Sequence, residues 1–368
     1  MNKLSQILCA AAILAMVAGC GKANKFTIGG TVDTDEANGK TVYLYNNETF
    51  NAGIHTPIDS AIVSDGKFLF KGTVDEPWIG IVANEYITAP VIVEPGQISL
   101  DSHGVGGTTL NDRMQAFSSS FSLDDIEAEM QDYIPLYYGA TNATERAEAE
   151  RILDSLEGIA NARALDAFWK LYNENSDNIL AVIAMEQIVA VDDFTYSELD
   201  SIVAAADPRV AKSSVVQEKL EQLRSIEATS VGKHYTDIQG VDGKLSDLID
   251  GKVALVDFYA SWCGPCRNEI KDNLVPLWKK YQKRGLVIVG LNVWERGDAA
   301  ARKAAHEKVM ADLGITYPQL VDSTATATKT YGVNGIPQIM LIGKDGTILA
   351  RDLRGAAIEE AVIKALEK

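Results

Sequence analysis

The sequence predicts a chain with three folded parts, the last of which is an α/β domain with a mixed central sheet and helices on both faces. Three observations lead to this prediction. Apolar and polar residues alternate from Phe26 onward, which is typical of half-buried strands. Across residues 109–230 the apolar residues recur at helical spacing instead. After residue 231, buried apolar runs at 253–259 and 286–293 alternate with amphipathic helices in a βαβ…ββα order.

Composition bounds the size and the class of the protein. The 368 residues are 46% hydrophobic and 23% charged, which predicts a globular chain of two or three domains. The net charge of −17 argues against a nucleic-acid partner, because nucleic-acid binding favours a basic face. Residues 109–230 hold 23 Asp and Glu against 9 Lys and Arg. A solvated helical surface accounts for this excess most simply, and an acidic docking face is the alternative.

The first residues have the pattern of an export signal. Lys3 supplies positive charge, and the apolar run at 7–17 is too short to span a bilayer. Small residues then precede Cys20, and this ending resembles the lipobox of bacterial lipoproteins. The resemblance implies a signal peptide over 1–19, acylation of Cys20 and a tether over 20–25. A buried helix with a chance cysteine, or a signal peptide cut elsewhere, are the alternatives.

Residues 253–268 contain the main candidate for chemistry. The apolar run at 253–259 predicts a buried strand, Trp-Cys-Gly-Pro-Cys follows at 262–266, and a helical pattern begins there. Cys263 would then lie at a helix N-terminus, where unpaired N–H groups and the helix dipole stabilise a thiolate. Cys266 lies one turn further along, close enough to form a disulfide with Cys263.

A redox role competes with three alternatives for this cysteine pair. A zinc site needs further ligands, and the sequence has no second pair of cysteines or histidines at metal-binding spacing. A structural disulfide across so short a loop would constrain the unfolded chain little. Unreactive thiols are the third alternative. A redox pair fits best because the motif follows a strand and opens a helix. The sequence indicates no metal and no cofactor.

Residues 253–268 resemble the active-site strand and turn of thioredoxins. The longer run Trp-Cys-Gly-Pro-Cys-Arg-Asn-Glu, ending at Glu269, resembles the TlpA/ResA family of membrane-tethered thiol–disulfide oxidoreductases. The resemblance covers roughly residues 234–368, and we assign 231–368 to a thioredoxin-like domain. It implies that Cys263 and Cys266 form the redox-active disulfide.

The resemblance also implies roles for individual residues. Cys263, as the exposed cysteine, would attack a partner disulfide, and Cys266 would resolve the mixed disulfide. Asp257 matches the buried proton acceptor of thioredoxin, and burial should raise its pKa. A structural hydrogen-bonding role for Asp257 is the alternative. Glu269 matches a carboxylate that tunes the thiols in the family, and a solvated helix residue is an equal alternative.

A second loop of the site is expected at Gly335-Ile336-Pro337, which resembles the cis-proline loop of thioredoxins. There Ile336 would offer its backbone to a partner peptide beside Cys263, with Pro337 as the cis residue. Trp262 would flank this groove, although packing in the core would also account for an aromatic residue.

The chain departs from the family at two positions. Lys271 replaces a proline that kinks the family's helix, so we expect the helix to break near Asn273 and restart at Pro276. Gly290 replaces the lysine of the third thioredoxin strand, which leaves open whether Asp257 has a counter-charge.

Residues 26–108 predict a small β-sandwich of about seven strands. The Asp65-Gly66 pair is a strong hairpin signal between two of them. This stretch resembles the domain of unknown function that precedes thioredoxin-like domains in some bacterial lipoproteins, chiefly at 66–72, and it has no catalytic motif. The expected strands cover 26–32, 41–46, 58–63, 67–74, 78–83, 90–94 and 97–101.

These features together predict a lipid-anchored thiol–disulfide oxidoreductase of the bacterial cell envelope, facing the periplasm. Its partners would be thiols and disulfides of exported proteins. The Gly-Pro between the cysteines matches thioredoxin, whose potential is about −270 mV against about −120 mV for strong oxidants, so we expect a reductant. A reductant needs an electron donor, such as a membrane thiol transporter.

Two rival functions remain. A peroxiredoxin-like peroxidase needs Thr three residues before the reactive cysteine and Pro seven before it, where this chain has Ala260 and Val256. A binding or adaptor lipoprotein, whose N-terminal domains capture a partner and whose redox activity is secondary, is the alternative from a different class.

Overall fold

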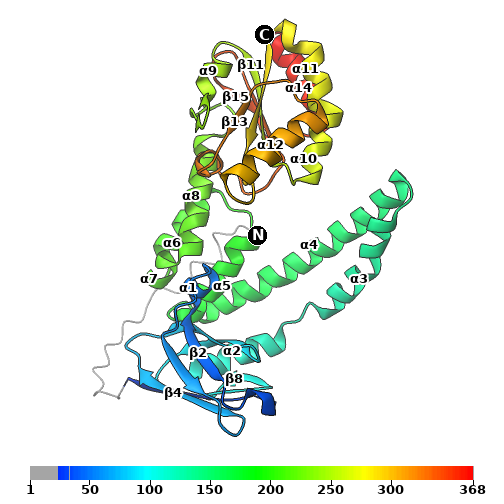
Figure 1. Ribbon diagram of the computed structural model, residues 1–368. Coiled ribbons are helices and arrows are strands. Elements are labelled where there is room, and N and C mark those ends of the chain that lie inside the picture. The colour runs from blue at the N-terminus through cyan, green and yellow to red at the C-terminus, as the bar shows by residue number, and fades with distance from the viewer. Residues whose placement is uncertain (1–23, 33, 368) are drawn as a thin grey trace. The chain divides into compact units, whose positions relative to one another are not determined.

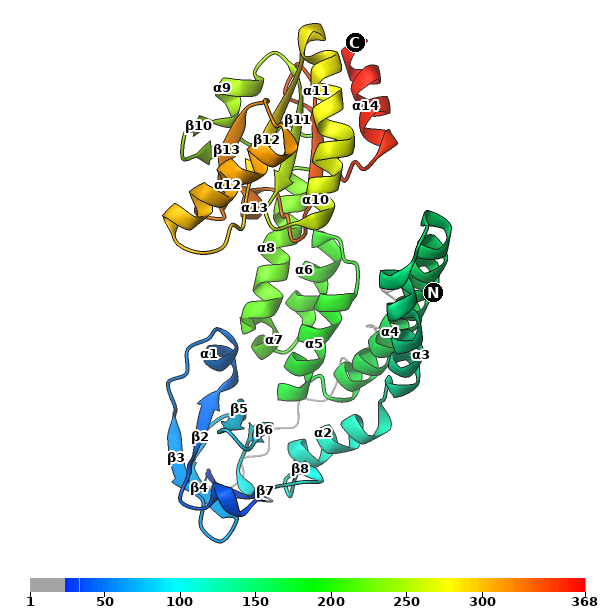
Figure 2. The same ribbon diagram turned by 45° about the vertical axis from the view of Figure 1, so that its right-hand side comes forward.

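A computed structural model describes residues 24–32 and 34–367, in two compact units that divide between Ile188 and Val189 (Figures 1 and 2). The expected signal peptide and the expected lipid-carrying Cys20 lie outside the described residues. None of the helices in the described ranges combines the length and the apolar character needed to cross a membrane.

The first unit begins with a β-sandwich, as predicted. Its two four-stranded sheets have the orders β4-β1-β7-β8 and β3-β2-β5-β6. Alternate side chains of both sheets, among them Ile28, Leu44 and Phe70, fill one shared hydrophobic core. The elements are β1 (Lys25–Thr31), β2 (Thr41–Asn46), α1 (Asn47–Asn51), β3 (Asp59–Ile62), β4 (Lys67–Thr73), β5 (Trp78–Ala83), β6 (Thr88–Val93), β7 (Gly96–Asp101) and β8 (Gly104–Gly106).

The hairpin predicted at Asp65-Gly66 is wrong, although the turn itself is present. Both residues have positive φ, 50° and 69°, and Ser64 and Lys67 form a single bridge across the turn. The flanking strands β3 and β4 nevertheless belong to different sheets. β4 pairs along its whole length with β1, so the turn carries the chain from one sheet to the other.

The predicted helical region contributes to both units. In the first unit Asn111 joins α2 to the sandwich, since its side chain accepts from the N–H of Ile92 at 2.9 Å and donates to the same residue's C=O at 2.7 Å. α3 and α4 lie side by side, and Asn142 caps α4. The helices are α2 (Thr109–Ser120), α3 (Asp124–Gly139), α4 (Ala143–Glu174), α5 (Ile179–Val191), α6 (Tyr196–Ala205), α7 (Pro208–Lys212) and α8 (Ser214–Ala228).

The second unit contains the predicted thioredoxin-like domain, with a five-stranded mixed sheet of order β13-β12-β11-β14-β15. β11 at its centre is parallel to β12 and antiparallel to β14. The elements are β9 (Gln239–Gly240), β10 (Gly243–Lys244), α9 (Leu245–Ile249), β11 (Val253–Tyr259), α10 (Gly264–Glu269), α11 (Val275–Tyr281), β12 (Leu286–Asn292), α12 (Ala299–Leu313), β13 (Gln319–Val321), α13 (Thr326–Thr330), β14 (Gln338–Ile342), β15 (Ile348–Ala350) and α14 (Ala356–Leu366).

Helices cover both faces of this sheet, as predicted. Leu255 and Tyr259 of β11 pack in a core with side chains of α10, α11, α12 and α14. Val256 and Phe258 point to the opposite face and share a second core with α9 and α13. The sheet therefore fixes the C-terminal end of β11, where the cysteine turn begins.

The break expected near Asn273 is wrong. A π-helical turn, Ile270–Leu274, connects α10 to α11, so the backbone stays helical from 264 to 281. Pro276 lies in the first turn of α11. The wider π turn accommodates the proline ring and its missing N–H without ending the helix.

Candidate redox site

The cysteine pair lies at the C-terminal end of β11, in the turn that opens α10. Cys263 and Cys266 are joined by a disulfide with their Cα atoms 5.3 Å apart. Cys263 is the N-cap of α10, and its sulfur accepts a hydrogen bond from the N–H of Cys266 at 3.1 Å. After reduction this donor and the helix N-terminus would stabilise a thiolate on Cys263.

The expectation that Cys263 is exposed is wrong for this disulfide form. Only 4% of Cys263 is accessible to solvent, against 0% of Cys266. Both residues pack in the core beneath α10 with Ile270. The order of exposure still favours Cys263 as the sulfur that a partner reaches first.

The loop expected beside the cysteines is there. The peptide bond between Ile336 and Pro337 is cis, and the C=O of Ile336 lies 3.8 Å from the Sγ of Cys263. Ile336 is half-buried and Pro337 is buried. The fold thus brings together two segments that are 73 residues apart in sequence.

Trp262, in the cysteine turn, lies at the surface rather than packing in the core. It is 44% exposed, and its indole N–H donates to the C=O of Trp294 at 2.9 Å. The guanidinium of Arg296 lies over its ring, 4.4 Å from the ring centre. Trp262 is therefore held at the surface by the loop that follows β12.

Asp257 lies on β11 beneath the cysteine turn and is fully buried. Neither of its carboxylate oxygens has a hydrogen-bond partner among the residues that the structure describes, so the structural hydrogen-bonding alternative finds no support. Burial raises the pKa of Asp257 to about 8, as predicted in direction. The positive charge of Arg354 opposes this shift and the negative charge of Glu269 adds to it.

Gly290 pairs with Asp257 across β11 and β12, at the position where thioredoxin has a lysine. A Cβ on Gly290 would lie 2.5 Å from the side chain of Gln319, which occupies that space. Arg354, 97 residues beyond Asp257 in the chain, supplies the opposing charge instead. No local pattern marks Arg354 for this role.

Glu269 is half-buried and hydrogen-bonded, which argues against the solvated-residue alternative. Its carboxylate accepts from the N–H of Gly355 at 3.1 Å and from the side-chain amide of Asn273 at 2.8 Å. Glu269 therefore joins α10 to the segment before α14 and acts electrostatically on Asp257. Its influence on the thiols stays a prediction.

Glu295, which sequence reasoning missed, holds the cysteine turn in place. Its carboxylate accepts from the backbone N–H of Ser261 at 2.6 Å, from the Ser261 hydroxyl at 2.7 Å and from the side-chain amide of Asn292 at 2.7 Å. Thirty-four residues separate Glu295 from Ser261, so no local pattern could reveal this contact.

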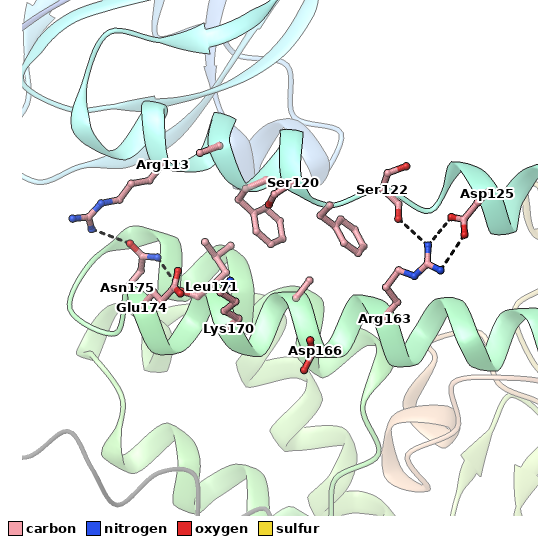
Figure 3. A pocket seen from close by; sticks show the side chains of 14 residues that line it. Arg113, Ser120, Ser122, Asp125, Arg163, Asp166, Lys170, Leu171, Glu174 and Asn175 are labelled. Carbon is pink, nitrogen blue, oxygen red and sulfur yellow. Dashed lines mark hydrogen bonds and ion pairs between the residues drawn. The ribbon is translucent and has the colours of Figure 1, made fainter.

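A cavity of about 1040 Å³ lies in the first unit, between α2 and α4 (Figure 3). Phe117 and Phe121 line it, and at one end Arg163 forms an ion pair with Asp125 at 2.6 Å. None of its lining residues is a cysteine or histidine. Within the described ranges, no cluster of three or more His, Cys, Asp or Glu could hold a metal ion.

Two family models match the chain, one in each unit. Residues 225–351 match the AhpC/TSA family, and residues 26–114 match a domain of unknown function, DUF4369. The thiol:disulfide interchange protein CycY of Rhizobium leguminosarum bv. viciae is 36% identical over 125 residues, which are 33% of this chain and 61% of CycY. A thiol:disulfide interchange protein of Chlorobium tepidum TLS has a solved structure with 27% identity and a TM-score of 0.31, covering 37% of this chain and 96% of that one.

The thiol–disulfide oxidoreductase ResA of Geobacillus thermodenitrificans (strain NG80-2) is 31% identical over 134 residues, which are 36% of this chain and 71% of ResA. The matched length is that of the thioredoxin-like domain, in which the paired cysteines lie at the end of a central strand beside a cis-proline. The chain accordingly belongs to the ResA-like thiol–disulfide oxidoreductases, with a thioredoxin-like domain of the AhpC/TSA family.

Proposed function

We propose that this protein reduces disulfides in exported proteins while a lipid on Cys20 anchors it in the bacterial cell envelope, facing the periplasm. The observation that carries the proposal is the Cys263–Cys266 disulfide at a helix N-terminus, with the C=O of Ile336 3.8 Å from the Cys263 sulfur. This arrangement supports attack by one thiolate and alignment of a partner peptide along the neighbouring loop.

The exchange needs only the chain's own residues. The Cys263 thiolate attacks a partner disulfide, forms a mixed disulfide and displaces one partner sulfur as a thiolate. The Cys266 thiolate then attacks the Cys263 sulfur and displaces the second. Two electrons pass to the partner, and the Cys263–Cys266 disulfide forms. Asp257, with a pKa of about 8, is suited to accept the Cys266 proton near neutral pH.

The direction of electron flow follows from the residues between the cysteines. Gly264 and Pro265 match thioredoxin, so we expect a reduction potential nearer to −270 mV than to −120 mV, the two values being about those of thioredoxin and of a strong oxidant. Equilibration of the purified protein with glutathione buffers, read by mass spectrometry of alkylated thiols, measures this potential. A value close to that of the strong oxidant would reverse the proposed direction.

The peroxidase alternative finds no support in the site. Ala260 stands where that chemistry needs a threonine hydroxyl, and its side chain is fully buried. Without that hydroxyl, the residue three positions before Cys263 has no side-chain group that could hydrogen-bond a peroxide.

A second candidate function, capture of a partner by the N-terminal domains, is supported by the cavity in Figure 3. A Cys266→Ser variant distinguishes the two, because the exchange proposal predicts that Cys263 stays covalently linked to exported proteins in cells. If no partner is trapped, and a variant without either cysteine rescues the phenotype of a deletion, capture becomes the better account.

A further inference from the structure

Charge is distributed unevenly along this acidic chain. Residues 231–368 contain 19 Lys and Arg against 17 Asp and Glu, a net charge of +2, whereas the whole chain carries −17. The preceding 230 residues therefore carry −19. The thioredoxin-like domain therefore holds 19 of the 34 Lys and Arg of the chain.

Three arginines from three separate segments contact the residues around the disulfide. Arg267 on α10 donates to the C=O of Ser261, two residues before Cys263, at 3.4 Å. Arg296, in the loop after β12, stacks on Trp262 with 4.4 Å to the ring centre.

Arg354, the third of them, lies in the segment before α14. It donates to the C=O of Pro337 in the cis-proline loop and to the C=O of its neighbour Leu353 at 2.8 Å. These contacts fix the three guanidinium groups along the cysteine turn on one side and the cis-proline loop on the other. We call Arg267, Arg296 and Arg354 the arginine rim.

Two carboxylates near the arginine rim are hydrogen-bonded to neutral groups and form no ion pair with the rim in the described ranges. Glu295 accepts three hydrogen bonds from Ser261 and Asn292, and Glu269 accepts from the backbone N–H of Gly355. Each hydrogen bond turns a carboxylate oxygen toward the protein.

Few carboxylates of the protein neutralise the positive charge of the rim arginines. Asp312 reaches Arg267 at 3.7 Å but forms its shorter contact, 2.8 Å, with Lys308. Arg296 and Arg354 have no carboxylate within ion-pair distance in the described part of the chain. Their positive charge is available to a partner.

We propose that the arginine rim selects protein disulfides that are flanked by acidic residues. This inference rests on the proposed function and adds the class of substrate. A partner disulfide that reaches Cys263 meets the cysteine turn and the cis-proline loop, the two segments that the rim arginines contact. Acidic flanking residues would speed the encounter with the rim and fix the orientation of the partner, whereas basic flanking residues would disfavour the encounter. Salt weakens both effects because Arg296 and Arg354 are exposed and Arg267 is partly exposed.

The test compares two synthetic peptides that contain the same disulfide loop and differ only in flanking residues, Glu in one and Lys in the other. Pre-reduced full-length protein reacts with each peptide in a single turnover. Its dithiol is oxidised to the Cys263–Cys266 disulfide and the peptide gains two thiols. We expect the Glu peptide to react about tenfold faster at about 20 mM salt. The ratio should fall toward one at about 500 mM salt.

Two sets of variants assign the preference to the rim. The triple variant Arg267→Gln, Arg296→Gln and Arg354→Gln should bring the ratio of the two rates close to one. Replacing the same arginines with Lys keeps the charge and should preserve most of the ratio, which separates charge from folding.

The matched control replaces three exposed lysines of the same unit with Gln. This removes the same amount of positive charge as the arginine-to-Gln variant, but at a distance from the disulfide. Lys279 lies on α11, Lys283 follows α11, and Lys344 lies in the β14–β15 turn. All three are toward the end of β11 that is opposite the cysteines. This control should keep the wild-type ratio. Equal wild-type rates for both peptides, or a ratio that the arginine-to-Gln variant retains, would overturn the inference. If the wild type reduces neither peptide, the proposed function itself fails.

Discussion

The carboxyl group of Asp257 is buried without a hydrogen bond from the described residues, and burial raises its pKa to about 8. In the unfolded chain an aspartate has a pKa of about 3.9. Between these two values the folded protein keeps a proton that the unfolded chain releases. Asp257 therefore contributes stability below about pH 4, and this contribution is lost as the pH rises to about 8.

We predict that Asp257→Asn removes this pH dependence. The free energy of unfolding of the wild type, relative to the variant, should fall by roughly 1.4 kcal/mol per pH unit between about pH 5 and 7. Urea unfolding of the oxidised full chain at several pH values measures the difference. If the free energy of unfolding changed with pH in the same way in both proteins, Asp257 would be ionised in the folded state.

Glu269 and Arg354 act on Asp257 with opposite sign. Glu269→Gln removes a negative charge and should lower the pKa of Asp257, whereas Arg354→Gln removes a positive charge and should raise it. The pH profile for reduction of a small uncharged disulfide reports the change, and its apparent pKa should move down in the first variant and up in the second. Shifts in the same direction would show that the variants act through structure rather than charge.

Residue by residue, local sequence reveals only part of this site. The cysteine pair, the buried carboxylate and the cis-proline loop each have a local pattern, and the structure brings Cys263 and Ile336 together. Glu295 and Arg354 have none, because each acts on a segment that is distant in sequence. The low exposure of Cys263 could not be predicted either, since it depends on how the surrounding core packs.

The cysteine turn and the loop after β12 behave as one element. Glu295 joins them by accepting three hydrogen bonds from Ser261 and Asn292. Trp262 adds a fourth contact through the C=O of Trp294. Trp294 has a φ of 54°, a left-handed conformation that is unfavourable for a bulky residue and that these contacts hold in place.

We predict that Glu295→Ala destabilises the protein by about 2–4 kcal/mol, because the variant leaves the Ser261 N–H and the Asn292 amide without their acceptor. It should also slow disulfide exchange, since the cysteine turn loses its support. Chemical unfolding and the single-turnover rate measure the two effects. Glu307→Ala removes an exposed carboxylate from α12 and should change stability by less than about 0.5 kcal/mol. Equal effects of the two variants would contradict this role of Glu295.

Among the strands and helices, prediction succeeded where a pattern was long and local. The periodicities in the sandwich, the helical region and the central strand β11 all have counterparts in the structure. Prediction failed where contacts between distant segments decide how strands pair and where helices end. The Asp65-Gly66 turn joins two sheets instead of one hairpin. The π turn before Pro276 likewise stands where the sequence predicted a break.

The chain as a whole combines an acidic N-terminal part with a redox domain of opposite net charge. Composition predicted a globular chain and argued against a nucleic-acid partner, but it could not locate the arginine rim. The rim emerges when the fold gathers Arg267, Arg296 and Arg354 around one disulfide. The export signal and the lipid on Cys20 stay predictions from sequence.

The reactivity of the two reduced thiols tests the central claim most directly. After reduction, the protein is treated with iodoacetamide between about pH 5 and 9, and each cysteine is followed by mass spectrometry. We predict that Cys263 is alkylated first, with an apparent pKa well below the ordinary value of about 8.5, while Cys266 stays largely unmodified. Sluggish alkylation of both thiols at neutral pH, or faster reaction of Cys266, would contradict the assignment of Cys263 as the attacking sulfur.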